Sequence, residues 1–166
     1  MNFPKCRDRV EVLIFWGNSM TNILSFDPAD KDDWLALWEA YLVFYKAHLP
    51  TEVGEQTWAR MIDPHGDILG FKAVDSNGKM VGMVTYLYHG TTWSSAKRCY
   101  LHDLYTLPET RGQGVGRALI EAVYKAAAEE GAEQVYWLTQ EFNYQGRILY
   151  DKVADKTPFI KYAKTI

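Results

Sequence analysis

Apolar and polar positions recur along this chain with two different periods, and the periods separate helices from strands. In the first half, apolar residues recur at helical spacing in two segments, which end at Pro50 and at Asp63-Pro64. Apolar runs flank Ser76-Asn77-Gly78, and Asn-Gly between two such runs is a strong hairpin signal. The first half is therefore predicted to hold a strand at 23–26, helices from Asp30 or Asp32 to His48 and from Val53 to Ile62, and strands at 68–74 and 80–88.

In the second half, strands and helices alternate. A strand is predicted at 99–107, and an apolar helical stripe at 115–130 ends at Gly131, a residue type that favours helix C-termini. A strand at 135–139, a helix at 143–153 and a last strand at 158–163 follow. The order β-α-α-β-β-β-α-β-α-β predicts an α/β fold with a mixed sheet and helices on both faces.

Residues 1–19 precede this pattern and allow more than one interpretation. Basic residues before the apolar run Val10–Trp16 hint at a secretory signal, but the run is short, contains Glu11 and lacks a good cleavage site after it. If Met20 is the natural start, residues 1–19 are an extension or are not part of the native protein; the alternative is that residues 10–15 form an extra edge strand. We therefore treat 1–19 as an N-terminal extension and 20–166 as the single folded domain.

Composition narrows the class of protein. With 166 residues, 48% hydrophobic and 23% charged, the chain is long enough for one domain with a sizeable core. A net charge of -3 argues against a nucleic-acid partner, and no apolar stretch has the length of a membrane helix. Cys6 and Cys99 without a secretory signal indicate reduced thiols in a cytoplasmic protein, and the four histidines lack the close spacing of a zinc site.

A glycine-rich loop stands between the strand at 99–107 and the helix at 115–130. The first turn of a helix leaves backbone N–H groups free and carries a partial positive charge, and glycines let the backbone approach a bulky anion. The spacing fails the dinucleotide fingerprint, whose third glycine would fall at Arg117, and the Walker loop, which needs lysine after Gly116. The loop therefore predicts a pyrophosphate site of another kind, with the sequence Arg111-Gly112-Gln113-Gly114-Val115-Gly116.

This loop closely resembles the acyl-coenzyme-A loop of the GNAT superfamily of N-acetyltransferases, whose form is Q/R-x-x-G-x-G/A. Two further segments match in the family's order: the strand at 100–105, and residues 143–150, which are similar to an N-x-x-A-x-x-L-Y segment with Gly146 in place of alanine. Residues 135–139 and 156–162 look most like the Hpa type, which groups with the spermidine/spermine acetyltransferases. The resemblance implies the GNAT acyl-CoA N-acyltransferase fold, with a mixed and mostly antiparallel sheet.

The resemblance also implies a donor and the residues that hold it. The donor is acetyl-CoA as cosubstrate, and no metal is implied. Family members offer it the loop, backbone N–H groups of a bulged preceding strand, and an asparagine that matches Asn143 here. Asparagine is also a favoured helix N-cap, and the two roles are compatible. The implied coenzyme-binding residues are Leu104, Tyr105, Thr106, Arg111, Gly112, Gln113, Gly114, Val115, Gly116, Arg117 and Asn143.

Three residues are candidates for the proton transfers of acetylation. Tyr150 matches the general acid proposed for the spermidine/spermine group, although it also fits a core position of its helix. His102 stands where that group has a glutamate, and a histidine titrating near pH 6.5 is able to accept a proton from the amine, directly or through water. Asp103 comes next, but strand alternation predicts that the two side chains lie on opposite faces and that only one reaches the amine.

The acceptor and the assembly stay open at this level. Polyamines, amino acids, aminoglycoside-like amines and lysine side chains all fit, and the acidic start of the first helix is a weak cue for a cationic acceptor. An acyl-CoA sensor without turnover, or transfer of succinyl or propionyl groups, are the alternatives. We expect a small-molecule amine substrate, no nucleic-acid or membrane partner, and a homodimer formed through the strand at 158–163, because an unpaired edge invites pairing.

Overall fold

The computed structural model describes residues 11–16 and 19–166, with side-chain environments from residue 21 onward. Its centre is a six-stranded sheet in which the strands follow one another in chain order. Neighbouring strands pair antiparallel except the last two, which are parallel, so the mixed and mostly antiparallel sheet is confirmed. The strands are β1 Glu11–Trp16, β2 Ser19–Ser25, β3 Leu69–Val74, β4 Met80–His89, β5 Arg98–Thr106 and β6 Gln134–Tyr136.

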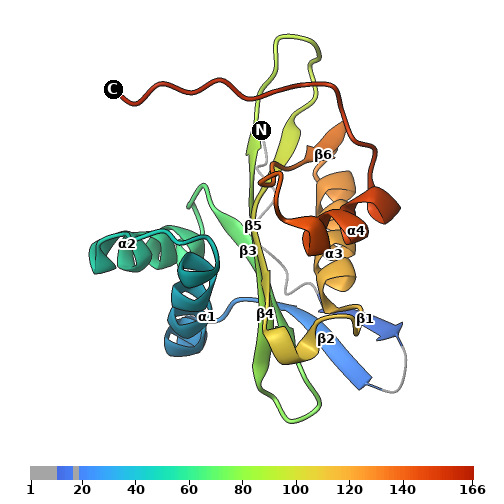
Figure 1. Ribbon diagram of the computed structural model, residues 1–166. Coiled ribbons are helices and arrows are strands. Elements are labelled where there is room, and N and C mark those ends of the chain that lie inside the picture. Colours follow the sequence, from blue (N-terminus) through green and yellow to red (C-terminus); the bar gives the residue numbers. More distant parts are fainter. Residues whose placement is uncertain (1–10, 17–18) are drawn as a thin grey trace, which may run out of the picture.

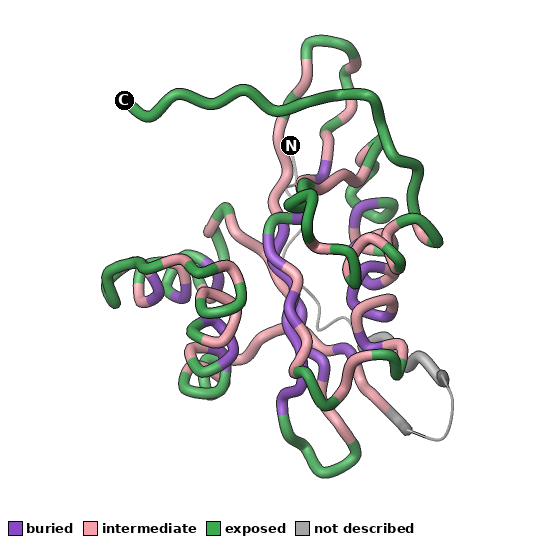
Figure 2. Tube along the Cα trace, viewed as in Figure 1, coloured by how far each residue is buried: buried purple, intermediate pink, exposed green. Residues whose placement is uncertain are grey.

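Helices cover both faces of this sheet (Figure 1). On one face lie α1 (Lys31–Phe44) and α2 (Thr51–Ile62), and on the other lie α3 (Val115–Glu129) and α4 (Tyr144–Val153). Two 3₁₀ turns, Pro28–Asp30 and Pro108–Thr110, precede α1 and the glycine loop. Figure 2 shows that the buried residues gather in the central strands and on the helix sides that face them. Within the described ranges, no helix is long and apolar enough to cross a membrane.

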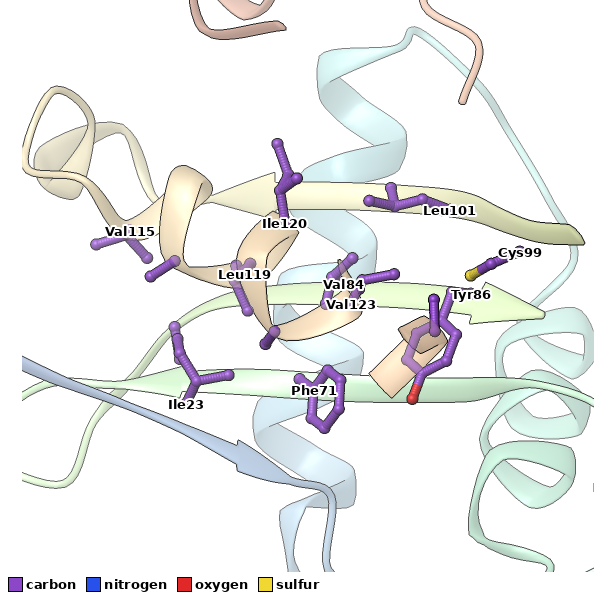
Figure 3. Packing of buried hydrophobic residues seen from close by; sticks show 14 of the residues in the cluster. Ile23, Phe71, Val84, Tyr86, Cys99, Leu101, Val115, Leu119, Ile120 and Val123 are labelled. Atoms are coloured by element: carbon purple, nitrogen blue, oxygen red, sulfur yellow. The ribbon is translucent and has the colours of Figure 1, made fainter. Parts of the chain in front are cut away.

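The larger core lies between α3 and the sheet (Figure 3). Residues three and four apart on α3 share one side of the helix, and Leu119, Ile120 and Val123 are fully buried there. Each such side chain contributes roughly 1.5–3 kcal/mol by leaving water. They pack against Phe71 and Leu101 of the sheet, among others. This packing holds the first turn of α3, and with it the glycine loop, beside the end of β5.

The second core joins α1 and α2 to the opposite face and is rich in aromatic rings. Trp34 and Trp38 of α1 stack with ring centroids 5.4 Å apart, and Trp58 of α2 lies 5.5 Å from Trp34. Rings of this size bury a large apolar area. Farther along α1, the ring of Tyr41 meets that of Tyr105 in β5 edge-on at 6.3 Å. The C-terminal end of α1 is thereby fixed against β5.

Two irregularities of β5 open the sheet. Its register with β4 shifts between Thr85 and Tyr86: Thr85 pairs with Asp103, whereas Tyr86 pairs with Leu101. His102 is therefore an extra residue in β5, a β-bulge, and beyond it the side chains change faces. β6 pairs only with residues 98–100 of β5, and it stops at residue 136 rather than at the predicted 139. Past residue 100, this edge of β5 has no strand partner in the described chain.

The predicted helices and the hairpin are confirmed, with some different ends. The first helix stops at Phe44 rather than His48, because the chain turns at Lys46, whose φ is 53°. The first predicted strand begins earlier, at Ser19, because it pairs along that length with β1. β1 itself is an edge strand within the segment before residue 20.

The predicted final strand is wrong for the single chain. Residues 158–163 have no regular secondary structure, and the apolar side chains of Phe159, Ile160 and Tyr162 are 78%, 73% and 88% exposed. In Figure 1 this segment runs from α4 and ends clear of the helices and the sheet. A strand needs a neighbour for its backbone N–H and C=O groups, and no described strand pairs with this segment.

Candidate active site

A pocket of about 470 Å³ opens where β5 has lost its strand partner. Four segments line it: the end of β5, the glycine loop with the first turn of α3, one side of α4, and the end of α1. Its described lining residues include three cations and no carboxylate; the cations are Arg111, Arg117 and Lys152. A pocket with this excess of positive charge attracts an anionic ligand.

The glycine loop has the backbone geometry of an anion site. Gly112 and Gly114 have φ of 77° and 89°, in the left-handed region that side chains other than glycine's rarely enter. Gly114 is the N-cap of α3, and among the described residues no side chain caps this helix. The N–H groups of its first turn and the positive end of its dipole are thus available to a ligand in the pocket. These features fit a pyrophosphate group.

All the predicted coenzyme-binding residues but one line this pocket. The exception is Gln113, whose side-chain amide donates a hydrogen bond to the Glu109 carbonyl at 2.9 Å. Contact of the others with the coenzyme stays a prediction. Sequence reasoning missed several lining residues of α4, which are spaced three and four apart and so share a side of the helix with one another rather than with Tyr150 or Asn143; these are Gln145, Ile148, Leu149 and Lys152.

The side chain of Arg111 is held by groups of the pocket wall. Its guanidinium carbon lies 5.5 Å from the ring centre of Phe44 and 5.8 Å from that of Tyr105, both within cation–π range. Its Nε donates to the Thr106 carbonyl at 3.4 Å. The charge is therefore fixed between α1 and β5, next to the glycine loop.

Asn143 caps α4, as one of its two interpretations predicted. Its Oδ1 accepts a hydrogen bond from the Gly146 N–H at 3.1 Å, and its Nδ2 donates to Thr139 Oγ1 at 3.0 Å. A Cβ at position 146 would lie 2.6 Å from Asn143 Nδ2, which is too close. The glycine that replaces the family's alanine therefore makes room for this orientation of the amide, which also faces the pocket.

Tyr150, on α4, lies in the pocket wall. Its ring packs edge-on against Trp137, with centroids 5.4 Å apart. Burial raises the pKa of Tyr150 to about 12. The phenol therefore keeps its proton at any physiological pH, which suits a hydrogen-bond donor.

His102 and Asp103 meet each other, so the expectation of opposite faces is wrong. The bulge at His102 breaks the alternation, and His102 Nδ1 lies 3.0 Å from Asp103 Oδ2. The imidazole is 54% exposed, whereas the carboxylate side chain is 6% exposed. The hydrogen bond to Asp103 raises the pKa of His102. Burial alone would raise the pKa of Asp103, but hydrogen bonds from His102, Thr85 and Tyr41 hold it below its usual value.

The pair does not line the pocket itself but adjoins it through the end of α1. Asp103 is hydrogen-bonded to Tyr41, whose ring contacts those of Tyr45 and Tyr105, at 4.9 and 6.3 Å. Tyr45 and Tyr105 both line the pocket. Along β5, His102 precedes Leu104 of the pocket wall by two residues, about 7 Å of extended chain. His102 and Asp103 thus lie beside the pocket, behind its wall of Leu104, Tyr45 and Tyr105.

Comparison with known proteins agrees with this geometry. Residues 33–154 match the acetyltransferase (GNAT) family, and the chain belongs to it. The chain is an N-acetyltransferase, which transfers an acetyl group to an amine.

Individual relatives show how far the similarity extends. The D-amino-acid N-acetyltransferase HPA3 of Saccharomyces cerevisiae is 39% identical over 148 residues, 89% of this chain and 92% of that protein. The thialysine N-epsilon-acetyltransferase of Bos taurus is 34% identical over 71 residues, 43% of this chain and 41% of that protein. Aminoglycoside N-acetyltransferase AAC(6')-Iy in complex with CoA has the same fold, with a TM-score of 0.76 at 16% identity over 92% of this chain and 99% of that chain.

Proposed function

We propose that this enzyme acetylates the amino group of a free amino acid, with acetyl-CoA as the donor and D-amino acids as the preferred acceptors. The observation that carries the proposal is a pocket whose wall includes the glycine loop and that has a His–Asp pair next to it. Similarity to the D-amino-acid N-acetyltransferase along 89% of the chain supports the acceptor class.

A polyamine acceptor is less well supported. The acidic residues that suggested it stand at the start of α1, whereas the pocket meets the end of α1, about 20 Å away along the helix axis. Asp30 is engaged there with Lys72 at 2.5 Å, and Asp27 caps the 3₁₀ turn. At the reacting end, Asp103 offers a single buried carboxylate, and a polyamine carries several positive charges.

The glycine loop and the start of α3 would hold the donor by its pyrophosphate, with Arg117 and Lys152 adding charge. Bound acetyl-CoA supplies an acetyl thioester. The chain then has two tasks at the reacting end: it must accept a proton from the amine, and it must stabilise the negative charge on the departing sulfur.

We assign the second task to Tyr150 and the first to His102. The Tyr150 hydroxyl keeps its proton, so it donates a hydrogen bond to the developing thiolate. His102, with Nδ1 at Asp103, has Nε2 left to accept the proton of the acceptor ammonium, directly or through water. The amine becomes a nucleophile only after that proton has left.

Release of free CoA thiol tests the proposal. The purified chain is incubated with acetyl-CoA and a panel that contains D- and L-amino acids, spermidine and an aminoglycoside. We expect thiol release with D-amino acids above that with their L enantiomers. Turnover of spermidine without turnover of any amino acid would contradict the proposed acceptor, and no turnover with any amine, despite acetyl-CoA binding, would favour a sensor.

We also propose a homodimer that involves residues 158–166. The exposed side chains of Phe159, Ile160 and Tyr162 support it, because contact with a second copy would remove this apolar area from water. Light scattering should give twice the chain mass, and deletion of the residues after Pro158 should halve it. A monomer for the intact chain at micromolar concentration would end this proposal.

A further inference from the structure

Two polar residues are buried within the described part of the chain, and they bond to each other. Thr85 is 1% and Asp103 4% exposed. Thr85 Oγ1 donates a hydrogen bond to Asp103 Oδ2 at 2.5 Å. Tyr41, from α1 across the sheet face, is also hydrogen-bonded to Asp103, and His102 Nδ1 approaches the same Oδ2 at 3.0 Å. The buried Asp103 carboxylate thus has three hydrogen-bond partners, which are Thr85, Tyr41 and His102. Because His102 is half-exposed, it connects this carboxylate to the surface on which the acceptor is proposed to react.

The geometry defines the proton positions on His102. An ionised carboxylate only accepts hydrogen bonds, so Nδ1 must carry the hydrogen that faces Asp103. In the neutral ring, Nε2 is then the acceptor, and it is this nitrogen that takes a proton from the amine. A carboxylate that rotated would no longer define the tautomer. Thr85 and Tyr41 hold Asp103 from β4 and α1, so two elements outside β5 fix its orientation.

We infer that Thr85 and Tyr41 are positioning residues of the acetyl transfer, which act through Asp103 to keep His102 in the Nδ1–H tautomer with Nε2 directed to the acceptor. This inference rests on the proposed role of His102 as the base. Neither Thr85 nor Tyr41 carries the reaction by itself. This positioning of His102 by Asp103 depends on the bulge at His102, because without the bulge the two side chains would lie on opposite faces of the sheet.

Several groups around His102 act on its titration. Asp103 raises its pKa, whereas burial and the charge of Lys161 in the C-terminal segment lower it. The ring of Tyr100 on β5 meets the imidazole edge-on at 5.2 Å. From α1, Tyr41 and Tyr45 stay neutral at physiological pH, because burial raises the pKa of each.

The positioning role makes a signed prediction. Thr85 and Tyr41 each share the negative charge of Asp103, so removal of either donor concentrates that charge on the bond to His102. The pKa of His102 should then rise, by about half a unit, the worth of one modest hydrogen bond. Asp103→Asn removes the charge, so it should move the pKa the opposite way. If the Thr85 and Tyr41 hydroxyls only stabilised the fold, their removal would leave the pKa of His102 unchanged.

The test is an NMR titration of histidine-labelled protein in which the His102 signals are assigned by their loss in His102→Gln. The variants are Thr85→Val, Tyr41→Phe and Asp103→Asn, with Thr85→Ser as the conservative variant that keeps the hydroxyl. Tyr88→Phe is a matched control, because Tyr88 packs on the α3 side of the sheet. Imidazole nitrogen shifts report the tautomer, and the pH dependence of kcat is measured on the same samples.

We expect Nδ1–H His102 in the wild type, a raised pKa in Thr85→Val and Tyr41→Phe, a lowered one in Asp103→Asn, and wild-type values in Thr85→Ser and Tyr88→Phe. The acid limb of kcat should follow these shifts, and plateau kcat should fall about fivefold in the two hydroxyl deletions. Unmoved His102 titrations, with kcat lowered equally at every pH, would overturn the inference while leaving the proposed function intact. The expected shifts in a protein that acetylates no amino acid would instead overturn only the acceptor.

Discussion

Replacing Tyr150 with phenylalanine removes one hydroxyl from the pocket and keeps the ring against Trp137. Burial raises the pKa of Tyr150 to about 12, and a free thiol titrates near 8.5. Complete proton transfer to the thiolate would be uphill by about 3.5 units, or roughly 5 kcal/mol. The hydroxyl is therefore expected to donate a hydrogen bond without giving up its proton. Such a bond to a charged group contributes about 1.5–3 kcal/mol, so kcat should fall by roughly 10- to 150-fold.

The assay is thiol release at saturating acetyl-CoA and amino acid, with acetyl-CoA affinity measured by calorimetry and expected to stay unchanged. Tyr124→Phe is the matched control, because the Tyr124 hydroxyl donates to the Val153 carbonyl at the end of α4, outside the pocket lining. Equal losses in both variants would mean that the packing of α4, not the Tyr150 hydroxyl, supports turnover. Full activity of Tyr150→Phe would return that residue to a packing role, and a loss beyond about 10³ would indicate complete proton transfer.

Three further substitutions have signed outcomes. Gly146→Ala gains about 1 kcal/mol of helix propensity but displaces the Asn143 cap, which contributes about as much; chemical unfolding should change little while calorimetry shows weaker acetyl-CoA binding. Gly114→Val should lower unfolding free energy by roughly 1–2 kcal/mol, because φ is 89°, and should weaken acetyl-CoA binding sharply; an unchanged Kd would remove the phosphate site. Lys72→Met removes the ion-pair partner of Asp30, whose carboxylate then keeps only the hydrogen bond from the Asp27 N–H, so unfolding free energy should fall by roughly 1–3 kcal/mol, with partial recovery in the double variant Asp30→Asn/Lys72→Met.

The parts of the fold that depend on local periodicity were predictable. The stripe of α3 and the Asn77-Gly78 hairpin turn are encoded in neighbouring residues, and both were confirmed. The bulge was not visible, because it arises from the register between two strands, with Thr85 opposite Asp103 and Tyr86 opposite Leu101. The final strand failed for a related reason, since alternation predicts only that a segment suits a strand and does not say whether another strand will pair with it.

The candidate site was likewise predictable where it depends on local sequence and unpredictable where it depends on contacts between distant elements. The glycine loop was predictable because its glycines meet a backbone requirement: Gly112 and Gly114 have positive φ, which other residues rarely adopt. Hydrogen bonds between side chains of distant elements have no sequence pattern of this kind. Thr85 and Tyr41 belong to no recognisable motif, and they meet Asp103 only in the folded protein.

The parts of the pocket proposed for the donor and for the acceptor are built differently, and this difference bears on substrate choice. The part of the pocket proposed to hold the donor is built largely from the backbone of the loop and α3, so it should tolerate side-chain changes elsewhere. The proposed acceptor site is built from side chains of two elements, the last turns of α1 with Tyr41 and Tyr45 and the bulged part of β5 with His102. Substitutions in these two segments should therefore change the KM for the amine while leaving the KM for acetyl-CoA alone. Tyr45 is an exception, because it also reaches Asn143 on the proposed donor side. A Tyr41 variant that altered both KM values equally would contradict this separation.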